Sequence, residues 1–343
     1  MRQGLGHHRW TATEPSALQL HLEDRLASHF GRRCPIVKLE RRASPYSSSF
    51  PVDELDVQLA DGSELRLVMK DLSFAAMSVR ARRMRPAFLY EPRREIQVYR
   101  WILPYAPAGT ATWYGAVTSS TSRRHWLFLE RVDGLELRHV GSLSTWKRAA
   151  QWIARFHQAF LSNGVARLVH TSRLLVYDEA FYWLWLDRAR AFAAGRPNAR
   201  QVVDRIARRY ATVVKRLVAM PLTLIHGEFY PCNIVIRETG GDVRVCPVDW
   251  EMAAFAPGLM DLASLTTGWA PRAQQALTRA YWAATPDGTR VSGAPPGFAI
   301  DLDCCRLHLA VRMLGWSDAW EPPPQHAFDW LADASRIAER LPA

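Results

Sequence analysis

The sequence has few cysteines and no long apolar run. Its five cysteines form no Cys-X-X-Cys pair and show no spacing of metal ligands, so we expect neither a disulfide framework nor a zinc site. No segment reaches the roughly eighteen uninterrupted apolar residues that a membrane span needs, and the first residues lack the apolar core of a secretion signal. These absences favour a cytoplasmic protein with reduced thiols and no membrane partner.

Lysine is also scarce, although the chain is strongly basic. Only four of the 44 basic residues are lysine, and the formal net charge is +11. Lysine is a compact point charge whereas arginine offers a planar fork, so each lysine invites a specific role. The densest basic run contains Arg80, Arg82, Arg83 and Arg85. A nucleic-acid patch or a solvated loop would account for it. No nucleic-acid-binding motif accompanies the run, so we favour the loop and expect no nucleic acid partner.

The distribution of apolar residues predicts two lobes. With 48% hydrophobic and 22% charged residues, the 343-residue chain can build two separate cores. Alternating patterns predict strands at 34–42, 54–59, 64–72, 111–119 and 125–132. After Gly134 the period changes from two to 3.6, which indicates helices at 145–161 and 200–218. We therefore expect an extension of uncertain role at 1–33, a strand-rich lobe at 34–133 and a helix-rich lobe at 134–343.

Two strand ends in the second lobe carry oxygen ligands. Glu228 follows a predicted strand, Asn233 lies five positions later, and Asp249 ends another strand after sixteen more residues. Mg²⁺ prefers few protein oxygens and fills its other positions with water and phosphate. A hairpin that brings Asn233 and Asp249 together would suit that metal. Glu228 would then lie where an acceptor hydroxyl binds, and Lys70 of the first lobe could reach nucleotide phosphates.

The order of these motifs resembles a known family. The chain contains His226-Gly227-Glu228, then Asn233, Asp249-Trp250-Glu251, Gly258 and Asp261-Leu262-Ala263. Together they resemble the aminoglycoside phosphotransferase and choline kinase group over residues 44–268. That resemblance implies an α+β, bilobal protein-kinase-like fold, with an antiparallel β N-lobe and a mainly helical C-lobe. It also implies that His226 and Asp261 brace the catalytic loop.

The resemblance further implies a nucleotide site. Lys70 would hold the α- and β-phosphates of ATP or GTP, with Glu95 as its ion-pair partner and Glu91 as the alternative. The backbone near Glu130 and Val132 would hydrogen-bond the purine edge. Asn233 and Asp249 would bind Mg²⁺ and Glu228 would be the catalytic carboxylate.

Two features depart from the family pattern. The turn at 44–50 has no glycine, so Ser47, Ser48 and Ser49 would cradle phosphate through hydroxyl and backbone N–H groups. Glu228 stands where the family has aspartate, and one more methylene moves the carboxylate by more than about 1 Å unless the backbone retreats. Glutamate is chemically the same base, so we expect an active kinase. A nucleotide-binding module without turnover, and a different acceptor or reaction, stay open.

An aromatic segment at 177–185 occupies the place of the acceptor pocket in the family. Tyr182 and Asp187 are candidate acceptor contacts, although at helical spacing half of such a segment belongs to the core. His157, on the apolar face of a helix, is expected to be a satisfied core histidine.

Taken together, the sequence predicts Mg²⁺-dependent transfer of the γ-phosphoryl group of ATP or GTP to a hydroxyl of a small metabolite, natural product or antibiotic. The net charge of +11 disfavours a polycationic aminoglycoside as acceptor. A catalytically impaired, nucleotide-binding regulatory module is the alternative function.

Overall fold

A computed structural model describes residues 14–46, 49–119, 121–161, 173–290, 293–316 and 328–342. The chain divides into two compact units. The first contains Met1–Ser78 and Thr112–Arg131, and the second contains Val79–Ala111 and Val132–Ala343.

The first unit is built on one antiparallel sheet. Its strands are β1 (Ile36–Ala43), β2 (Val52–Leu59), β3 (Glu64–Asp71), β4 (Trp113–Ser119) and β5 (Arg124–Glu130), in the order β1-β2-β3-β5-β4. All five strands confirm the alternation in the sequence. Between β2 and β3, Gly62 has φ +87° and the Asp61 carboxylate accepts the N–H of Ser63 at 2.9 Å. This is the turn chemistry that such a tight connection needs.

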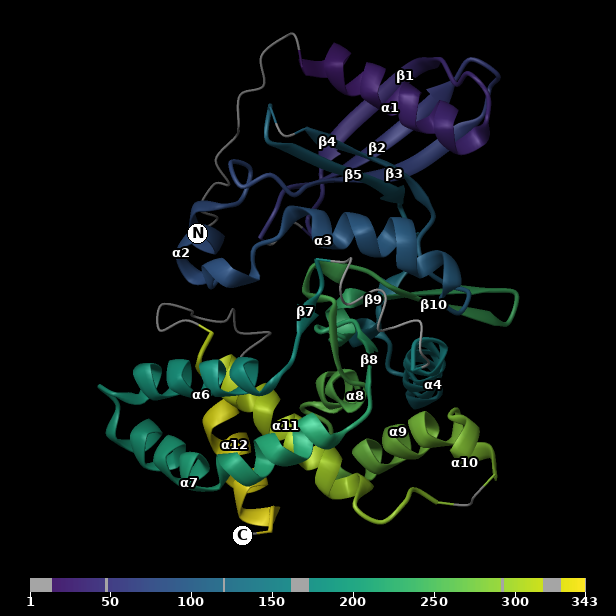
Figure 1. The fold of residues 1–343 in the computed structure, drawn as a ribbon. Helices are drawn as coiled ribbons and strands as arrows, with labels where there is room; N and C mark the ends of the chain where they lie inside the picture. The colour runs from purple at the N-terminus through teal and green to yellow at the C-terminus, as the bar shows by residue number, and fades with distance from the viewer. Residues whose placement is uncertain are drawn as a thin grey trace. The chain divides into compact units, whose positions relative to one another are not determined.

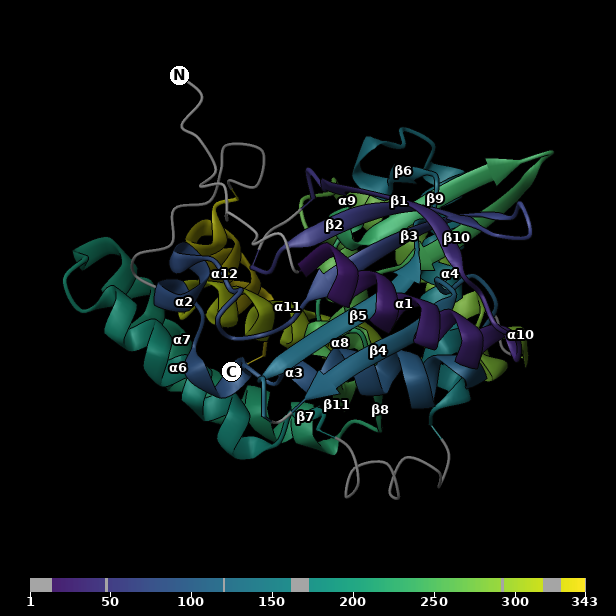
Figure 2. The same cartoon turned by 90° about the horizontal axis from the view of Figure 1, so that it is seen from above.

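Helix α1 (Glu14–Phe30) covers one face of this sheet (Figures 1 and 2). Its Leu18, Leu22 and Leu26 recur at intervals of four and are buried in one cluster with Leu67 and Met69 of β3. Helix α1, which lies within the segment 1–33 whose role the sequence left open, therefore contributes to the first core. Because side chains alternate along a strand, Val68 and Lys70 belong to the opposite face of β3.

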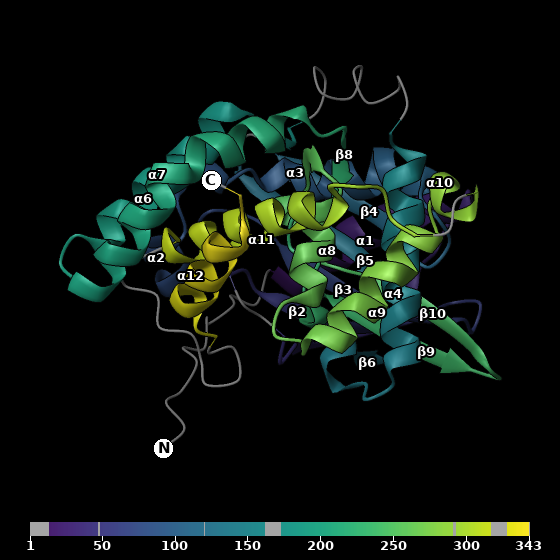
Figure 3. The ribbon, with the colours of Figure 1, turned by 90° about the horizontal axis from the view of Figure 1, so that it is seen from below.

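The second unit is mainly helical. Its longer helices are α4 (Leu143–Ala159), α6 (Glu179–Ala193), α7 (Pro197–Ala219), α8 (Leu259–Thr266), α9 (Pro271–Ala283), α11 (Phe298–Leu314) and α12 (Trp330–Arg340). The short helices are α2 (Val79–Met84), α3 (Pro92–Gln97) and α10 (Pro286–Arg290). Figure 3 shows α6, α7, α11 and α12 packed as one group. Helices α4 and α7 confirm the predictions at 145–161 and 200–218.

Short strands place the loops that matter for chemistry. One small sheet has the order β10 (Asp242–Pro247), β9 (Ile234–Thr239), β6 (Leu135–Glu136); the other has β7 (Leu175–Val176), β11 (Ala254–Pro257), β8 (Leu222–Ile225). In the β9–β10 hairpin Ile234 pairs with Pro247. Residues 226–233 therefore connect β8 to β9, and residues 248–253 connect β10 to β11.

The unit boundary differs from the predicted one. The sequence assigned 79–111 to the strand-rich lobe, whereas this segment packs with the second unit. The reason is that α3 buries Arg94 and Glu95, which bond to the backbone of Glu251 and Trp250. No helix in the described part of the chain has the length and apolar character to cross a membrane.

Candidate active site

The turn after β8 is held by one buried carboxylate. Asp261 of α8 is fully buried and accepts hydrogen bonds from the backbone N–H of His226 at 2.7 Å and of Gly227 at 2.9 Å. Gly227 has φ +83°, and a Cβ there would lie 2.1 Å from the carbonyl oxygen of Met252. Only glycine meets both conditions, so the backbone fixes this part of the motif.

Two histidines complete the brace. His226 Nε2 lies 2.9 Å from the carbonyl oxygen of Val248, which ties the turn to the end of β10. His157 is buried and lies 3.1 Å from Asp261 and 2.8 Å from the Tyr281 hydroxyl. The expectations that His226 and Asp261 brace the loop and that His157 is a satisfied core histidine are confirmed.

Asn233 and Asp249 are brought together by the β9–β10 hairpin. The N–H of Val248 donates to the carbonyl oxygen of Asn233 at 2.9 Å, so Asp249 follows directly on a residue bonded to Asn233. The Asn233 amide N–H donates to the carbonyl oxygen of Glu228 at 3.0 Å. Asp249 has φ +67°, a left-handed conformation that only one other non-glycine residue of the described chain, Arg123, adopts. Such backbone strain is concentrated at functional sites.

The donor set of this hairpin fits Mg²⁺. No three His, Cys, Asp or Glu side chains cluster as metal ligands within the described residues. Mg²⁺ needs no such cage, because it is held by one or two protein oxygens together with water and substrate phosphates. With its amide nitrogen bonded to Glu228, the side chain of Asn233 has its oxygen as the remaining ligand atom. The Asp249 carboxylate would supply the negative charge that such a cation requires.

Glu228 lies in the turn between β8 and β9, near the carboxylates of Glu251 and Asp249. Its side chain is 19% exposed, and its backbone carbonyl accepts from the N–H of Tyr230 at 2.6 Å. The pKa of Glu228 is raised to about 7: burial is the main cause, the carboxylates of Glu251 and Asp249 add to it, and the guanidinium groups of Arg312 and Arg85 oppose it. A carboxylate whose pKa lies near neutral pH is suited to accept a proton from a hydroxyl.

The third carboxylate of the group, Glu251, is held by an arginine. Arg85 Nη1 lies 2.9 Å from Glu251 Oε1, and both side chains are largely buried. Arg85 belongs to the basic run that the sequence analysis assigned to a solvated loop. That expectation is wrong for Arg85, because its guanidinium is buried and paired with Glu251. Arg80, Arg82 and Arg83 are exposed, as expected for a solvated segment.

Helix α3 holds the loop after β10. Arg94 Nη1 donates to the carbonyl oxygen of Glu251 at 2.6 Å, and burial, with a contribution from Arg85, lowers the pKa of Arg94 to about 10. Glu95 is buried and accepts the N–H of Trp250 at 3.2 Å. Glu91 caps α3 and pairs with Arg173 at 2.9 Å. Glu95 therefore has a backbone partner in its own unit.

The predicted phosphate contacts lie in the first unit. Lys70 of β3 is half-buried and is opposite Val52 of β2 and Leu127 of β5 in the ladder. Lys70 and Glu95 belong to different units, so their ion pair stays a prediction. The carbonyl oxygen of Ser49 accepts the N–H of Ser78 at 3.1 Å. The two other serines of the turn, Ser47 and Ser48, lie outside the described residues.

The predicted purine contacts fall at the end of β5. The backbone N–H of Glu130 donates to the carbonyl oxygen of Thr112 at 2.9 Å, and its carboxylate accepts the Thr112 N–H at 3.0 Å. The N–H of Glu130 thus has a bond within its own unit. Val132 follows the end of the strand and stays the predicted donor and acceptor for a purine edge.

The two predicted acceptor contacts both lie on helix α6. Tyr182 is fully buried, lies 4.7 Å centroid to centroid from His308, and has a hydroxyl with no hydrogen-bond partner. Asp187 has a side chain that is 67% exposed and pairs with Arg190 at 3.1 Å. The structure places one in the core and the other on the surface, so it does not bring them together.

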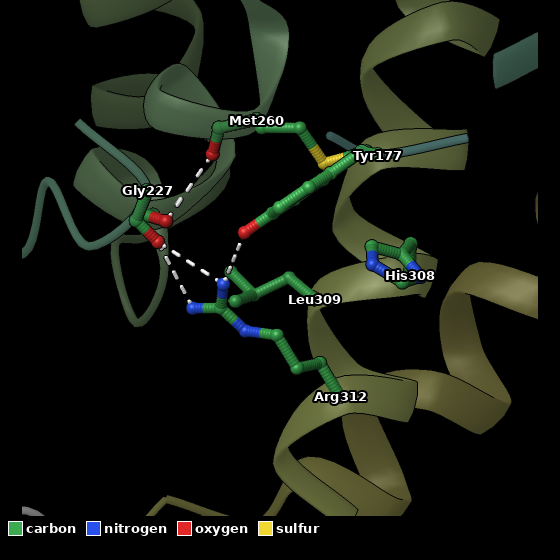
Figure 4. Close-up of a pocket in the computed structure, with 7 residues that line it drawn as sticks. Tyr177, Gly227, Met260, His308, Leu309 and Arg312 are labelled. Carbon is green, nitrogen blue, oxygen red and sulfur yellow. Dashed lines mark hydrogen bonds between the residues drawn. The ribbon is translucent and has the colours of Figure 1, made fainter. Parts of the chain in front are cut away.

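Arg312 is a residue of this site that was not predicted from the sequence. This arginine of α11 is buried and donates to the carbonyl oxygen of Gly227 from both terminal nitrogens at 3.1 Å (Figure 4). It also donates to the hydroxyls of Tyr177 at 2.8 Å and Tyr230 at 3.1 Å. A cavity of about 10 Å³ between α11 and the loop is lined by Arg312, Tyr177, Gly227 and His308, among others. The available signal was an arginine within Leu307–Leu314, a segment that is otherwise apolar except for His308.

Comparison with known proteins identifies the family. The model of the phosphotransferase enzyme family, APH, matches residues 59–293. The chain belongs to this family. It is a phosphotransferase that acts on an alcohol group, with the α+β protein-kinase-like fold that the sequence predicts. No curated protein matches the chain.

Solved structures share the fold at low identity. Macrolide 2'-phosphotransferase MphH from Brachybacterium faecium is 16% identical, with 94% of this chain and 99% of that chain covered and a TM-score of 0.55. A microcompartment-associated aminopropanol kinase is 14% identical, with 88% and 92% covered and a TM-score of 0.58. The GDP complex of wild-type aminoglycoside 2'-phosphotransferase-IIIa is 12% identical, with 94% and 97% covered and a TM-score of 0.55.

Proposed function

We propose that this phosphotransferase moves the γ-phosphoryl group of ATP or GTP to a hydroxyl of a small metabolite, natural product or antibiotic. The observation that carries the proposal is the loop geometry of the second unit. One hairpin holds Asn233 beside Asp249, and the braced turn before it presents Glu228. The relatives with this fold include one solved with GDP and others named for macrolide and aminopropanol substrates.

Each residue has a distinct task in the proposed transfer. Mg²⁺ held by Asn233 and Asp249 would neutralise charge on the β- and γ-phosphates. Glu228 orients the acceptor hydroxyl and takes its proton. The acceptor oxygen bonds to the γ-phosphorus while the bond to the β,γ-bridging oxygen breaks, and the nucleoside diphosphate leaves. Lys70 is proposed to bind the α- and β-phosphates, and the backbone of Val132 the purine.

Glutamate in place of aspartate is compatible with this reaction. The transition state of phosphoryl transfer is loose, so the carboxylate mainly positions the hydroxyl and removes its proton late. A base that binds its proton near pH 7 matches that task. The presence of glutamate at position 228, where the family has aspartate, is therefore compatible with turnover.

A transfer assay tests the proposal. The protein is incubated with Mg²⁺ and ATP or GTP against a panel of hydroxylated acceptors, and products are identified by the mass of one added phosphoryl group. Glu228→Gln and Glu228→Ala should reduce the rate by on the order of 100-fold or more. Glu339→Gln is the matched control, because Glu339 is an exposed carboxylate of α12 paired with Arg205. Unchanged rates in both Glu228 variants would remove this residue from the mechanism.

A regulatory module without turnover is the second candidate. Glu228 at the catalytic position and the glycine-free turn at 44–50 favour it. Isothermal titration with Mg-ATP and Mg-GTP separates the candidates when combined with the transfer assay. Nucleotide binding without product formation over the whole acceptor panel supports the module, and any acceptor phosphorylated at a Glu228-dependent rate supports the kinase.

A further inference from the structure

Arg312 connects α11 to both ends of the catalytic turn. Its two terminal nitrogens grip the carbonyl oxygen of Gly227, immediately before Glu228, and one of them also donates to the hydroxyl of Tyr230, two residues after it. Tyr177, which follows β7, accepts a fourth bond. The guanidinium thus touches the backbone or side chain on either side of Glu228, as Figure 4 shows for Gly227 and Tyr177.

Within the described residues, the guanidinium of Arg312 has one carboxylate as its close counter-ion. A buried charge is costly unless an opposite charge and hydrogen bonds compensate it. The four bonds of Arg312 go to neutral oxygens, from one carbonyl and two hydroxyls. Among the residues that the structure describes, the carboxylate paired with it is that of Glu228, with Nη2 and Oε1 4.0 Å apart. Because its hydrogen-bond partners are neutral, the buried Arg312 interacts electrostatically with the nearby carboxylate of Glu228.

Because the side chain of Glu228 is longer than that of aspartate, its carboxylate needs to be held in position. Glutamate places its carboxylate more than about 1 Å further from the backbone than aspartate, and errors of that size reduce rates by on the order of 100-fold. Arg312 can correct the position of this carboxylate in two ways. Its bonds to Gly227 and Tyr230 fix the backbone of the turn, and its charge attracts the carboxylate toward α11.

We propose that Arg312 is a positioning residue, which holds the carboxylate of Glu228 where it can orient the acceptor hydroxyl. This inference rests on the proposed kinase function. Arg312 acts through Glu228, since its hydrogen bonds and its ion pair in the described structure all go to Tyr177, to Glu228 and to the turn around Glu228. Its removal should therefore lower kcat and leave the Kd for Mg-nucleotide within about threefold, because both the backbone bonds and the charge of Arg312 act on the position of the catalytic carboxylate.

The test is a double-mutant cycle between Arg312→Met and Glu228→Gln. With Glu228 present, Arg312→Met should lower the rate of phosphoryl transfer by on the order of 100-fold. With Glu228→Gln already in place, the same change should lower the residual rate by less than about threefold, because residues that act as a unit are not additive. Arg312→Lys should recover part of the rate, since it keeps the charge and loses the planar fork.

Arg306→Met is the matched control. Arg306 is a partly buried arginine of the same helix that contacts Asp303 at 3.2 Å and Thr266 at 3.1 Å, away from the catalytic turn. The Arg306→Met change should destabilise the protein without changing kcat, both in the wild type and in the Glu228→Gln variant. An equal loss of rate from Arg312→Met in both backgrounds would assign Arg312 a merely structural role and overturn the inference, as would an unchanged rate in the wild-type background.

A stability cycle keeps the inference separate from the proposed function. If no acceptor is phosphorylated by the wild type, the kinase proposal fails, but the pairing is still decided by thermal denaturation at pH 8. Arg312→Met should lower the Tm by more in the wild type than in Glu228→Gln, because it strands the carboxylate among Asp249 and Glu251. Equal Tm losses in the two backgrounds would show that Arg312 and Glu228 are not coupled.

Discussion

Replacing Glu228 by glutamine should stabilise the protein at alkaline pH. The carboxylate of Glu228 is largely removed from water and lies near those of Asp249 and Glu251, and these conditions raise its pKa from 4.5 to about 7. Glutamine has the shape of the protonated acid and never carries the charge. The change should therefore relieve an unfavourable charge while it removes the catalytic group, which is the usual trade between stability and function.

The size of the effect follows from linkage. Between pH 4.5 and 7 the folded state holds a proton on Glu228 that the unfolded state has released, so stability falls as pH rises through this window. Each pKa unit corresponds to about 1.4 kcal/mol, so at pH 8 the ionised carboxylate opposes folding by about 3 kcal/mol. At pH 5 the folded acid is protonated, and the difference from glutamine falls below about 1 kcal/mol.

Urea and thermal denaturation of the protein without nucleotide or metal measure this difference. Glu228→Gln should exceed the wild type by about 3 kcal/mol at pH 8, or roughly 6 to 12 °C in Tm for a unit of this size, with most of that gain absent at pH 5. The exposed Glu339→Gln should show no such pH dependence. A Glu228→Gln protein less stable than the wild type at pH 8, or a gain equal at both pH values, would refute the reasoning.

Three further predictions concern the metal, the turn and the nucleotide. Asp249→Asn should lower the transfer rate on the order of 100-fold and raise the Mg²⁺ concentration needed for half-maximal activity, as steady-state kinetics over a Mg²⁺ series would show; an unchanged Mg²⁺ requirement contradicts the ligand assignment. Gly227→Ala should destabilise by at least about 3 kcal/mol in urea denaturation, because its Cβ meets a carbonyl at 2.1 Å, whereas Gly241→Ala, with open space around it, should lose about 1 kcal/mol. Lys70→Arg should weaken nucleotide binding at least about tenfold by calorimetry, and the exposed Lys38→Arg should not; equal affinities would remove Lys70 from the nucleotide site.

Local chemistry explains how much of the fold was predictable. The strands at 54–59 and 64–72 were predictable because the alternation in each agrees with the turn residues Asp61-Gly62 between them. Helix α1 was missed as a structural element, although its three leucines recur at helical spacing, because its packing partners on β3 lie some fifty residues away. The sequence placed 79–111 with the strands, whereas the structure groups this segment with the second unit, because Arg94 and Glu95 bond to a loop more than 150 residues later.

The candidate site shows the same limit. The hairpin joins Asn233 to Asp249 over a short distance in sequence, so their proximity was predictable from strand ends. Arg312 was not, because its partners at Tyr177 and Gly227 precede it by 135 and 85 positions. Tyr182 was proposed as an acceptor contact from an aromatic pattern, but aromatic residues of a helix can face either the core or the surface. In the structure Tyr182 is buried in the core. Long-range burial, rather than motif chemistry, decided these cases.

A crystal structure with Mg²⁺ and a non-hydrolysable nucleoside triphosphate tests the central claim most directly. The account predicts one triphosphate with Lys70 Nζ at its α- and β-phosphates, a metal ligated by Asn233 Oδ1 and the Asp249 carboxylate, and Glu228 facing the γ-phosphate. A metal bound away from the β9–β10 hairpin, or a triphosphate that contacts neither Lys70 nor that metal, would contradict it.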